Sequence, residues 1–198
     1  MSNIIYMDNN ATTKVAPEVL ETMLPYFSEQ YGNPSSMYSF AHKVGGEIKA
    51  ARNNVANLVN ADPEELIFTS CGTESDSTAI MSAIHANPLK RHIITTRVEH
   101  PAVKSLAENL QAKTGHKYRV TQLAVDSEGM LDLAEYEEAL CDDTAIVSVM
   151  WANNETGVIF PVHEMAKIAR NRGVLFHTDA VQAVGKIPID LKKSYIDF

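Results

Sequence analysis

The chain has 198 residues, of which 45% are hydrophobic and 21% are charged, a composition typical of folded globular proteins. Its 17 Lys and Arg against 25 Asp and Glu give a net charge of -8, which disfavours binding to nucleic acids or to anionic membrane surfaces. We find no signal-peptide pattern and no apolar run of about 18 residues, so we expect a cytoplasmic protein. Cys71 and Cys141 are too far apart for a CxxC motif, and we expect no disulfide framework and no metal site.

The first part of the chain is predicted to be helical. Residues 16–30 have a helical pattern with Pro17 in its first turn, and residues 42–58 have a longer one. The segment GNPSS at residues 32–36 lies between them and is typical of a turn.

From residue 65 onward, short apolar or β-branched runs alternate with helical patterns. Strands are predicted at residues 66–69, 92–96, 145–150 and 174–177. Helices are predicted at residues 74–86, 102–114, 133–140 and 162–172. This alternation predicts an α/β fold with a largely parallel (mixed) sheet sandwiched by helices. Residues 196–198 resemble the beginning of a further strand, so we expect the chain to be a fragment.

Polar clusters follow the first and the fourth predicted strands. Gly72 and Thr73 lie between a strand and a helix, where backbone N–H groups and the helix dipole can hold a phosphate; an ordinary capped turn is the alternative. Asp179 follows the fourth strand, where a carboxylate can pair with the protonated ring nitrogen of pyridoxal phosphate; an acidic cap is the alternative. Gln182 could bind the phenolic oxygen of the cofactor, or face solvent.

The second and third predicted strands also end in polar residues. His100 could stack on a ring or shuttle protons, although a lone histidine is more often structural. Asn154 could donate to a substrate carboxylate or to the cofactor, and a turn built from Asn and Gly is the alternative. Because four such clusters, one after each predicted strand, should meet at one edge of the sheet, together they predict a pyridoxal-phosphate site.

Six segments make the chain resemble the NifS-type cysteine desulfurases of the class-V aminotransferase family. They are YMDNNATT (6–13), GNPSS (32–36), FTSCGTES (68–75), VEHPAV (98–103), MWANNETG (150–157) and HTDAVQAVGK (177–186). The resemblance implies the fold type I of pyridoxal-phosphate enzymes. Residues 1–15 would be the N-terminal segment of a small domain and residues 16–198 an incomplete large, cofactor-binding domain. It also implies a substrate contact by Asn33.

The family's activity would be removal of sulfur from L-cysteine, giving L-alanine and an enzyme persulfide for a NifU-like iron–sulfur scaffold protein. The resemblance further implies a homodimer, and the segments at 70–73 and 150–152 resemble the nitrogenase-associated branch. The Schiff-base lysine would follow Phe198 in a Ser-His-Lys context and the nucleophilic cysteine would come later, so we expect the 198 residues to be inactive alone. A selenocysteine lyase, another enzyme of this fold, and a non-catalytic dimerisation or binding module are the alternatives.

No cysteine or lysine within the 198 residues is expected to replace the nucleophilic cysteine or the Schiff-base lysine. Asp142 and Asp143 should raise the pKa of the Cys141 thiol and make it a poor nucleophile. Cys71 is expected to be a small packing residue. Lys186 lies in a segment that, in the family, leads away from the cofactor ring.

Overall fold

The computed structural model describes residues 4–113 and 117–198. The chain divides into two compact units, one up to Leu66 and one from Ile67 to Phe198, and each is described by itself. The predicted small-domain assignment of residues 1–15 stays a prediction. No helix in the described part of the chain is long and apolar enough to cross a membrane, and the expected cytoplasmic location stays a prediction.

The first unit is helical. Its elements are α1 (Pro17–Met23), α2 (Pro25–Ser28), α3 (Ser39–Val59) and a 3-10 turn (Pro63–Glu65). The predicted single helix over residues 16–30 is wrong, because Pro25 has no N–H to continue the helical hydrogen bonds and begins the separate helix α2. Helix α3 begins earlier than predicted and ends at Asn60, whose φ of 53° gives the left-handed cap common at helix ends.

The second unit contains a four-stranded, fully parallel sheet in the order β2-β1-β3-β4. Its strands are β1 (His92–Thr96), β2 (Arg119–Leu123), β3 (Thr144–Ser148) and β4 (Leu175–His177). The predictions at 92–96, 145–150 and 174–177 are confirmed as β1, β3 and β4, with shifted ends.

Two strand predictions need correction. Residues 66–69 lie in no strand, and Ile67 and Phe68 are 79% and 55% exposed, so these two apolar side chains are not buried against the sheet. Strand β2 was not predicted, because only its last residue, Leu123, is buried and polar residues dominate an edge strand of this kind.

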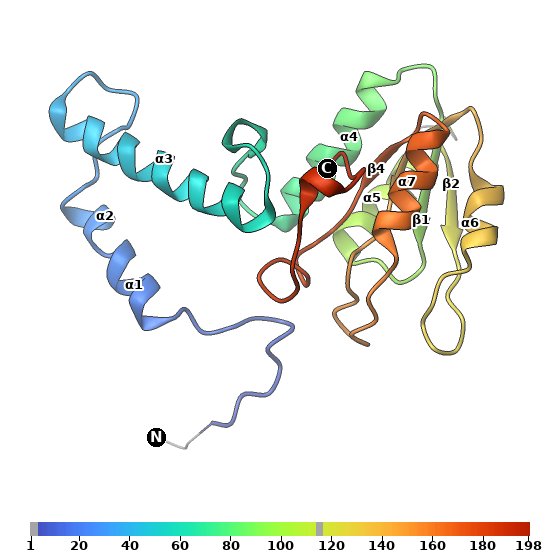
Figure 1. Cartoon of the computed structure of the whole chain (residues 1–198), viewed down its shortest axis with the longest axis horizontal. Helices are drawn as coiled ribbons and strands as arrows, with labels where there is room; N and C mark the ends of the chain where they lie inside the picture. Colours follow the sequence, from blue (N-terminus) through green and yellow to red (C-terminus); the bar gives the residue numbers. More distant parts are fainter. Residues whose placement is uncertain (1–3, 114–116) are drawn as a thin grey trace. The chain divides into compact units, whose positions relative to one another are not determined.

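Helices cover both faces of the sheet, as predicted (Figure 1). Helices α4 (Gly72–Ala86) and α5 (Pro101–Lys113) pack on one face, and α6 (Leu133–Ala139) and α7 (Val162–Asn171) on the other. Successive side chains of a strand point to opposite faces of the sheet. In β1, Ile93 therefore belongs to the core beneath α4 and α5, whereas Ile94 belongs to the core on the α6 and α7 side. Thr114, the last residue of the helix predicted at 102–114, lies outside the described residues.

The order of the strands creates a switch point between β1 and β3. The chain passes from β1 outward to β2 and then returns to form β3 on the other side of β1. In open α/β sheets, the loops that follow two such strands diverge and leave a crevice for ligands. The loops at 97–100 and 149–157 are therefore placed where a ligand is expected.

Beyond β4, the chain runs to a 3-10 turn at Leu191–Lys193 and returns to the sheet. Asp197 donates its N–H to Phe176 O at 2.8 Å, and Thr178 donates its N–H to Phe198 O at 3.0 Å. The segment at 196–198 is therefore hydrogen-bonded to β4 and to Thr178, but it is not a strand in this structure.

Candidate functional site

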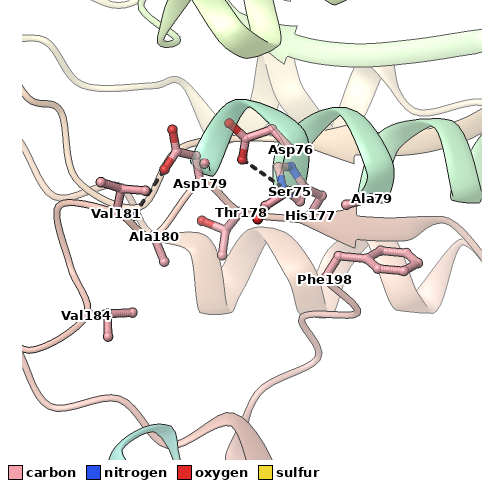
Figure 2. A pocket seen from close by; sticks show the side chains of 11 residues that line it. Ser75, Asp76, Ala79, His177, Thr178, Asp179, Ala180, Val181, Val184 and Phe198 are labelled. Carbon is pink, nitrogen blue, oxygen red and sulfur yellow. Dashed lines mark hydrogen bonds and ion pairs between the residues drawn. The ribbon is translucent and has the colours of Figure 1, made fainter. Parts of the chain in front are cut away.

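A pocket of about 390 Å³ opens where β4 ends and α4 begins (Figure 2). Two of the predicted site residues, Gly72 and Asp179, line it together. The lining residues are Gly72, Ser75, Asp76, Ala79, His177, Thr178, Asp179, Ala180, Val181, Val184 and Phe198.

The beginning of α4 forms one wall of the pocket. Gly72 is the first helical residue, and the side chain of the preceding Cys71 makes no capping hydrogen bond. A Cβ on Gly72 would lie 3.6 Å from Val181 Cγ2, so glycine leaves space at the pocket wall. Thr73 is exposed in the same turn. Since the first N–H groups of a helix lack intrahelical partners, this wall suits an anion.

Asp179 brings a buried carboxylate to the same pocket. The residue is 8% exposed, and its Oδ1 accepts a hydrogen bond from Val181 N at 3.0 Å. Burial, and further the carboxylate of Asp76, raise the pKa of Asp179, while His177 and His100 lower it. A cationic group in the pocket would compensate for the desolvated charge.

Asp76 and His177 line the same pocket and were not assigned a role from the sequence. His177 Nε2 lies 3.5 Å from Asp76 Oδ1, and His177 Nδ1 is hydrogen-bonded to Ser148 Oγ at 2.8 Å. These contacts hold the His177 ring from both of its nitrogens, and Figure 2 shows the pair of His177 and Asp76. Their positions in the sequence could have indicated them. Asp76 follows Gly72 by about one helical turn, and His177 is the last residue of β4.

The other predicted residues do not line this pocket. His100 Nδ1 accepts a hydrogen bond from Ala102 N at 3.2 Å, at the beginning of α5. Asn154 donates to Glu155 Oε1 at 2.9 Å. His100 is nevertheless close enough to Asp179 to lower its pKa.

Gln182 and Asn33 also make local contacts. Gln182 Oε1 accepts a hydrogen bond from Lys186 Nζ. Asn33 lies in the first unit, where its Oδ1 accepts a hydrogen bond from Ser35 N at 3.0 Å. The cofactor and substrate roles of His100, Asn154, Gln182 and Asn33 stay predictions.

Glu99 is a further buried carboxylate beside this site. It is 6% exposed, and burial raises its pKa to about 7. Hydrogen bonds from Met150 and Thr96 lower the pKa, and the nearby charges of Asp179 and Asp76 raise it. Three acidic side chains therefore lie near one another at the carboxyl end of the sheet.

The expectation for the two cysteines was wrong. Burial raises the pKa of the Cys141 thiol, but hydrogen bonds from Thr144 and Arg119 outweigh it, so that the pKa is lowered overall. Arg119 Nη2 lies 3.3 Å from Cys141 Sγ, a contact between residues that are far apart in the sequence and that no local pattern reveals. Cys71 is exposed and is not a packing residue.

The residues of the pocket fit the two charged ends of pyridoxal phosphate. The beginning of α4 offers N–H groups for the phosphate, and Asp179 offers a carboxylate for a protonated pyridine nitrogen. Thr178 Oγ1 is buried at the pocket and has no hydrogen-bond partner among the described residues, so it can accept a further polar contact.

A family profile and several known proteins match this chain. The sequence profile of the aminotransferase class-V family matches residues 5–198. Cysteine desulfurase NifS of Azotobacter vinelandii is 57% identical over 97% of this chain, which covers 47% of that protein. A solved NifS-like protein has a TM-score of 0.92 at 40% identity, covering 98% of this chain and 53% of that one. A solved structure of SspA in complex with cysteine has a TM-score of 0.90 at 34% identity, covering 97% of this chain and 55% of the other.

The chain thus spans about half the length of the relatives it matches. The profile match covers nearly all of its residues, and the structural match includes both of its units. The chain belongs to the class-V aminotransferase family and is similar to its cysteine desulfurases of the NifS type.

Proposed function

We propose that the full-length protein is a pyridoxal-phosphate-dependent cysteine desulfurase that converts L-cysteine to L-alanine and transfers the sulfur to an enzyme cysteine as a persulfide. Relatives at 53–57% identity are named cysteine desulfurases, and a solved relative was obtained in complex with cysteine. The observation that carries the proposal is the pocket that places the beginning of α4 and the Asp179 carboxylate around one space.

The residues of this chain would bind and orient the cofactor. Pyridoxal phosphate, when bound, supplies an electron sink for the electron pair released at the substrate Cα. The N–H groups at Gly72 and Thr73 would hold the phosphate. Asp179 would hold the proton on the pyridine nitrogen, because an ionised carboxylate favours the protonated ring. His177, fixed between Asp76 and Ser148, would keep the floor of the pocket rigid.

Three further contacts complete the proposed site. The His100 imidazole would stack on the pyridine ring and could carry a proton to or from the substrate. Gln182 would donate to the phenolic oxygen, which requires its carboxamide to rearrange from its contact with Lys186. Asn154 would contact the carboxylate of the substrate; the substrate contact that the resemblance implies for Asn33 stays a prediction.

The partners of the whole protein are also proposed. The NifS name of the Azotobacter relative supports a role in iron–sulfur cluster assembly for nitrogen fixation, with a NifU-like scaffold as the sulfur acceptor. We further propose a homodimer. Covalent attachment of the cofactor and the persulfide would rely on a lysine and a cysteine outside these 198 residues.

Binding of the cofactor can be tested on the chain itself. Pyridoxamine 5′-phosphate is a suitable probe, because it lacks the aldehyde that reacts with surface lysines. We expect the wild-type chain to bind it and Asp179→Asn to bind it about 10-fold to 100-fold more weakly, as for a lost charged hydrogen bond. The control is Asp142→Asn, an exposed aspartate outside the pocket. Equal affinity of the Asp179 variant and the wild type would contradict the proposed site.

Activity must be measured on the full-length gene product. With L-cysteine and added pyridoxal phosphate, we expect alanine and an enzyme persulfide that alkylation traps. With an added thiol reductant, which is oxidised to its disulfide, the persulfide should be released as sulfide. Alanine without persulfide would favour another enzyme of the same fold. No product from L-cysteine would refute the desulfurase proposal.

A further inference from the structure

We infer that Glu99 and Asn153 form a reciprocal clamp that fixes the positions of His100 and Asn154 relative to Asp179. The inference rests on the proposed function, because it gives these two buried side chains a role in shaping the cofactor site. Neither side chain lines the pocket. Both are positioning residues, which act through the neighbours that follow them in the chain.

Glu99 connects the loop after β1 to the loop after β3. Its Oε1 and Oε2 accept the N–H of Met150 at 3.0 and 3.1 Å, although Glu99 and Met150 are far apart in sequence. Thr96 Oγ1 donates to Glu99 Oε1 at 2.7 Å, which fixes the direction of the carboxylate. The loop that carries His100 is thereby tied to the backbone just beyond β3.

Asn153 makes the complementary connection in the opposite direction. Its Nδ2 donates to Val98 O at 3.1 Å, so that the loop after β3 holds the backbone of the loop after β1. Its Oδ1 accepts the N–H groups of Glu155 and Thr156 at 3.0 and 2.9 Å. The same side chain therefore also shapes the turn that presents Asn154.

The clamp is linked to the strand that carries Asp179. Trp151 donates its N–H to Asp179 O at 2.9 Å, directly after Met150. One short segment, 150–153, is thus held by the loop of His100 on one side and by Asp179 on the other. Side-chain hydrogen bonds of Glu99 and Asn153 thus join the loops after β1 and β3, and a backbone hydrogen bond joins the loop after β3 to the one after β4.

Burial makes these contacts hard to replace. Glu99 and Asn153 are each 6% exposed, and a buried polar group that loses its partner has little water to replace it. A clamp built from side chains at the ends of strands can hold two diverging loops at a fixed spacing. Catalytic groups need such spacing to well below 1 Å.

The test compares two substitutions of Glu99 with one elsewhere. Glu99→Gln keeps an oxygen that can accept from Met150 N and Thr96 Oγ1, whereas Glu99→Met has a similar length and no strong acceptor. The matched control is Thr144→Val at the other end of β3. Thr144 is buried and its Oγ1 accepts from Cys141 N at 3.0 Å and contacts His92 Nδ1 at 2.9 Å, so its loss also destabilises the fold.

Three quantities are measured for each variant: the thermal midpoint, the affinity for pyridoxamine 5′-phosphate, and the emission maximum of Trp151. Trp151 is the only tryptophan of the chain and is 3% exposed, so its emission reports the placement of segment 150–153 without any ligand. We expect Glu99→Met to weaken binding about tenfold or more and to shift the emission to longer wavelength. Glu99→Gln should restore both, and Thr144→Val should lower only the thermal midpoint.

Different results separate the clamp from the proposed function. If the wild-type chain does not bind the probe, the cofactor site fails, and the emission of Trp151 in the ligand-free variants still decides the clamp. The clamp is refuted if Glu99→Met leaves both the emission and the affinity unchanged, or if Thr144→Val changes them as much. Asn153→Asp, which keeps the oxygen and removes the donor to Val98 O, should weaken binding as Glu99→Met does; unchanged binding would remove Asn153 from the clamp.

Discussion

Ionisation of Glu99 should make the second unit less stable as the pH rises, and Glu99→Gln should remove this pH dependence. The pKa of this carboxyl rises from 4.5 to about 7 on folding, chiefly through burial. For an acid with a raised pKa, the stability associated with the neutral form is fully present below pH 4.5 and is lost as the pH rises through about 7. Glu99→Gln cannot ionise, so this loss should disappear.

The size of the effect follows from the two pKa values. The gap between them, at about 1.4 kcal/mol per pH unit, corresponds to about 3 kcal/mol of unfolding free energy above pH 8. At pH 5 the wild type and the glutamine variant should differ by about 1 kcal/mol or less, because the amide oxygen can replace the acceptor for Met150 N. At pH 9 the variant should be more stable by about 2 to 3 kcal/mol.

Urea unfolding followed by Trp151 fluorescence measures this difference, since Trp151 lies in the second unit. Asp179 and Asp76, whose charges raise the pKa of Glu99, are present in both proteins, so the comparison isolates the ionisation of Glu99. Glu74→Gln is the control of opposite sign: hydrogen bonds from Ser70 lower the pKa of Glu74, so its contribution is lost as the pH falls. A stability difference between Glu99→Gln and the wild type that is the same at pH 5 and pH 9 would refute the reasoning.

Two further predictions concern groups outside the pocket. Tyr136 is fully buried and donates to Met165 O at 2.9 Å. Tyr136→Phe should lower the unfolding free energy by about 1 kcal/mol and leave the affinity for pyridoxamine 5′-phosphate unchanged. An altered affinity would contradict the separation of α6 from the site. In a Cys71→Ser background, Arg119→Met should slow alkylation of Cys141 by iodoacetamide at neutral pH, because the guanidinium lowers the pKa of that thiol. An unchanged rate would show that the hydrogen bond from Thr144 is enough to lower the pKa without Arg119.

Sequence reasoning predicted the two central strands and β4 but missed the edge strand β2. Strands β1 and β3 are buried along their whole length, and this burial requires the continuous apolar or β-branched runs that a reader of the sequence recognises. Strand β2 has a polar sequence and was missed. Residues 66–69 have the composition of a strand without being one, because composition does not show whether a partner strand is present.

The candidate site divides in a similar way. Asp179 was predicted at the pocket because the carboxyl ends of parallel strands meet at one edge of the sheet, a rule that needs only the chain order. Gly72 lines the same pocket as the first residue of α4, although residues 66–69 before it form no strand. Glu99 and Asn153 were not found, since each acts on the backbone of a residue about 50 positions away. Such contacts leave no local pattern in the sequence.

The distribution of charge around the pocket argues for a ligand with separated charges rather than for a simple anion or cation. The beginning of α4 favours a negative group, while Asp179 and Asp76 line the same space and Glu99 lies behind them. An anion alone would meet these carboxylates, and a cation alone would leave the helix N–H groups without a partner. A phosphate linked to a protonated ring satisfies both. Because burial raises the pKa of Asp179, binding of such a ring should be accompanied by loss of a proton from this carboxyl. The affinity for pyridoxamine 5′-phosphate should therefore rise with pH. Asp179→Asn should abolish this rise.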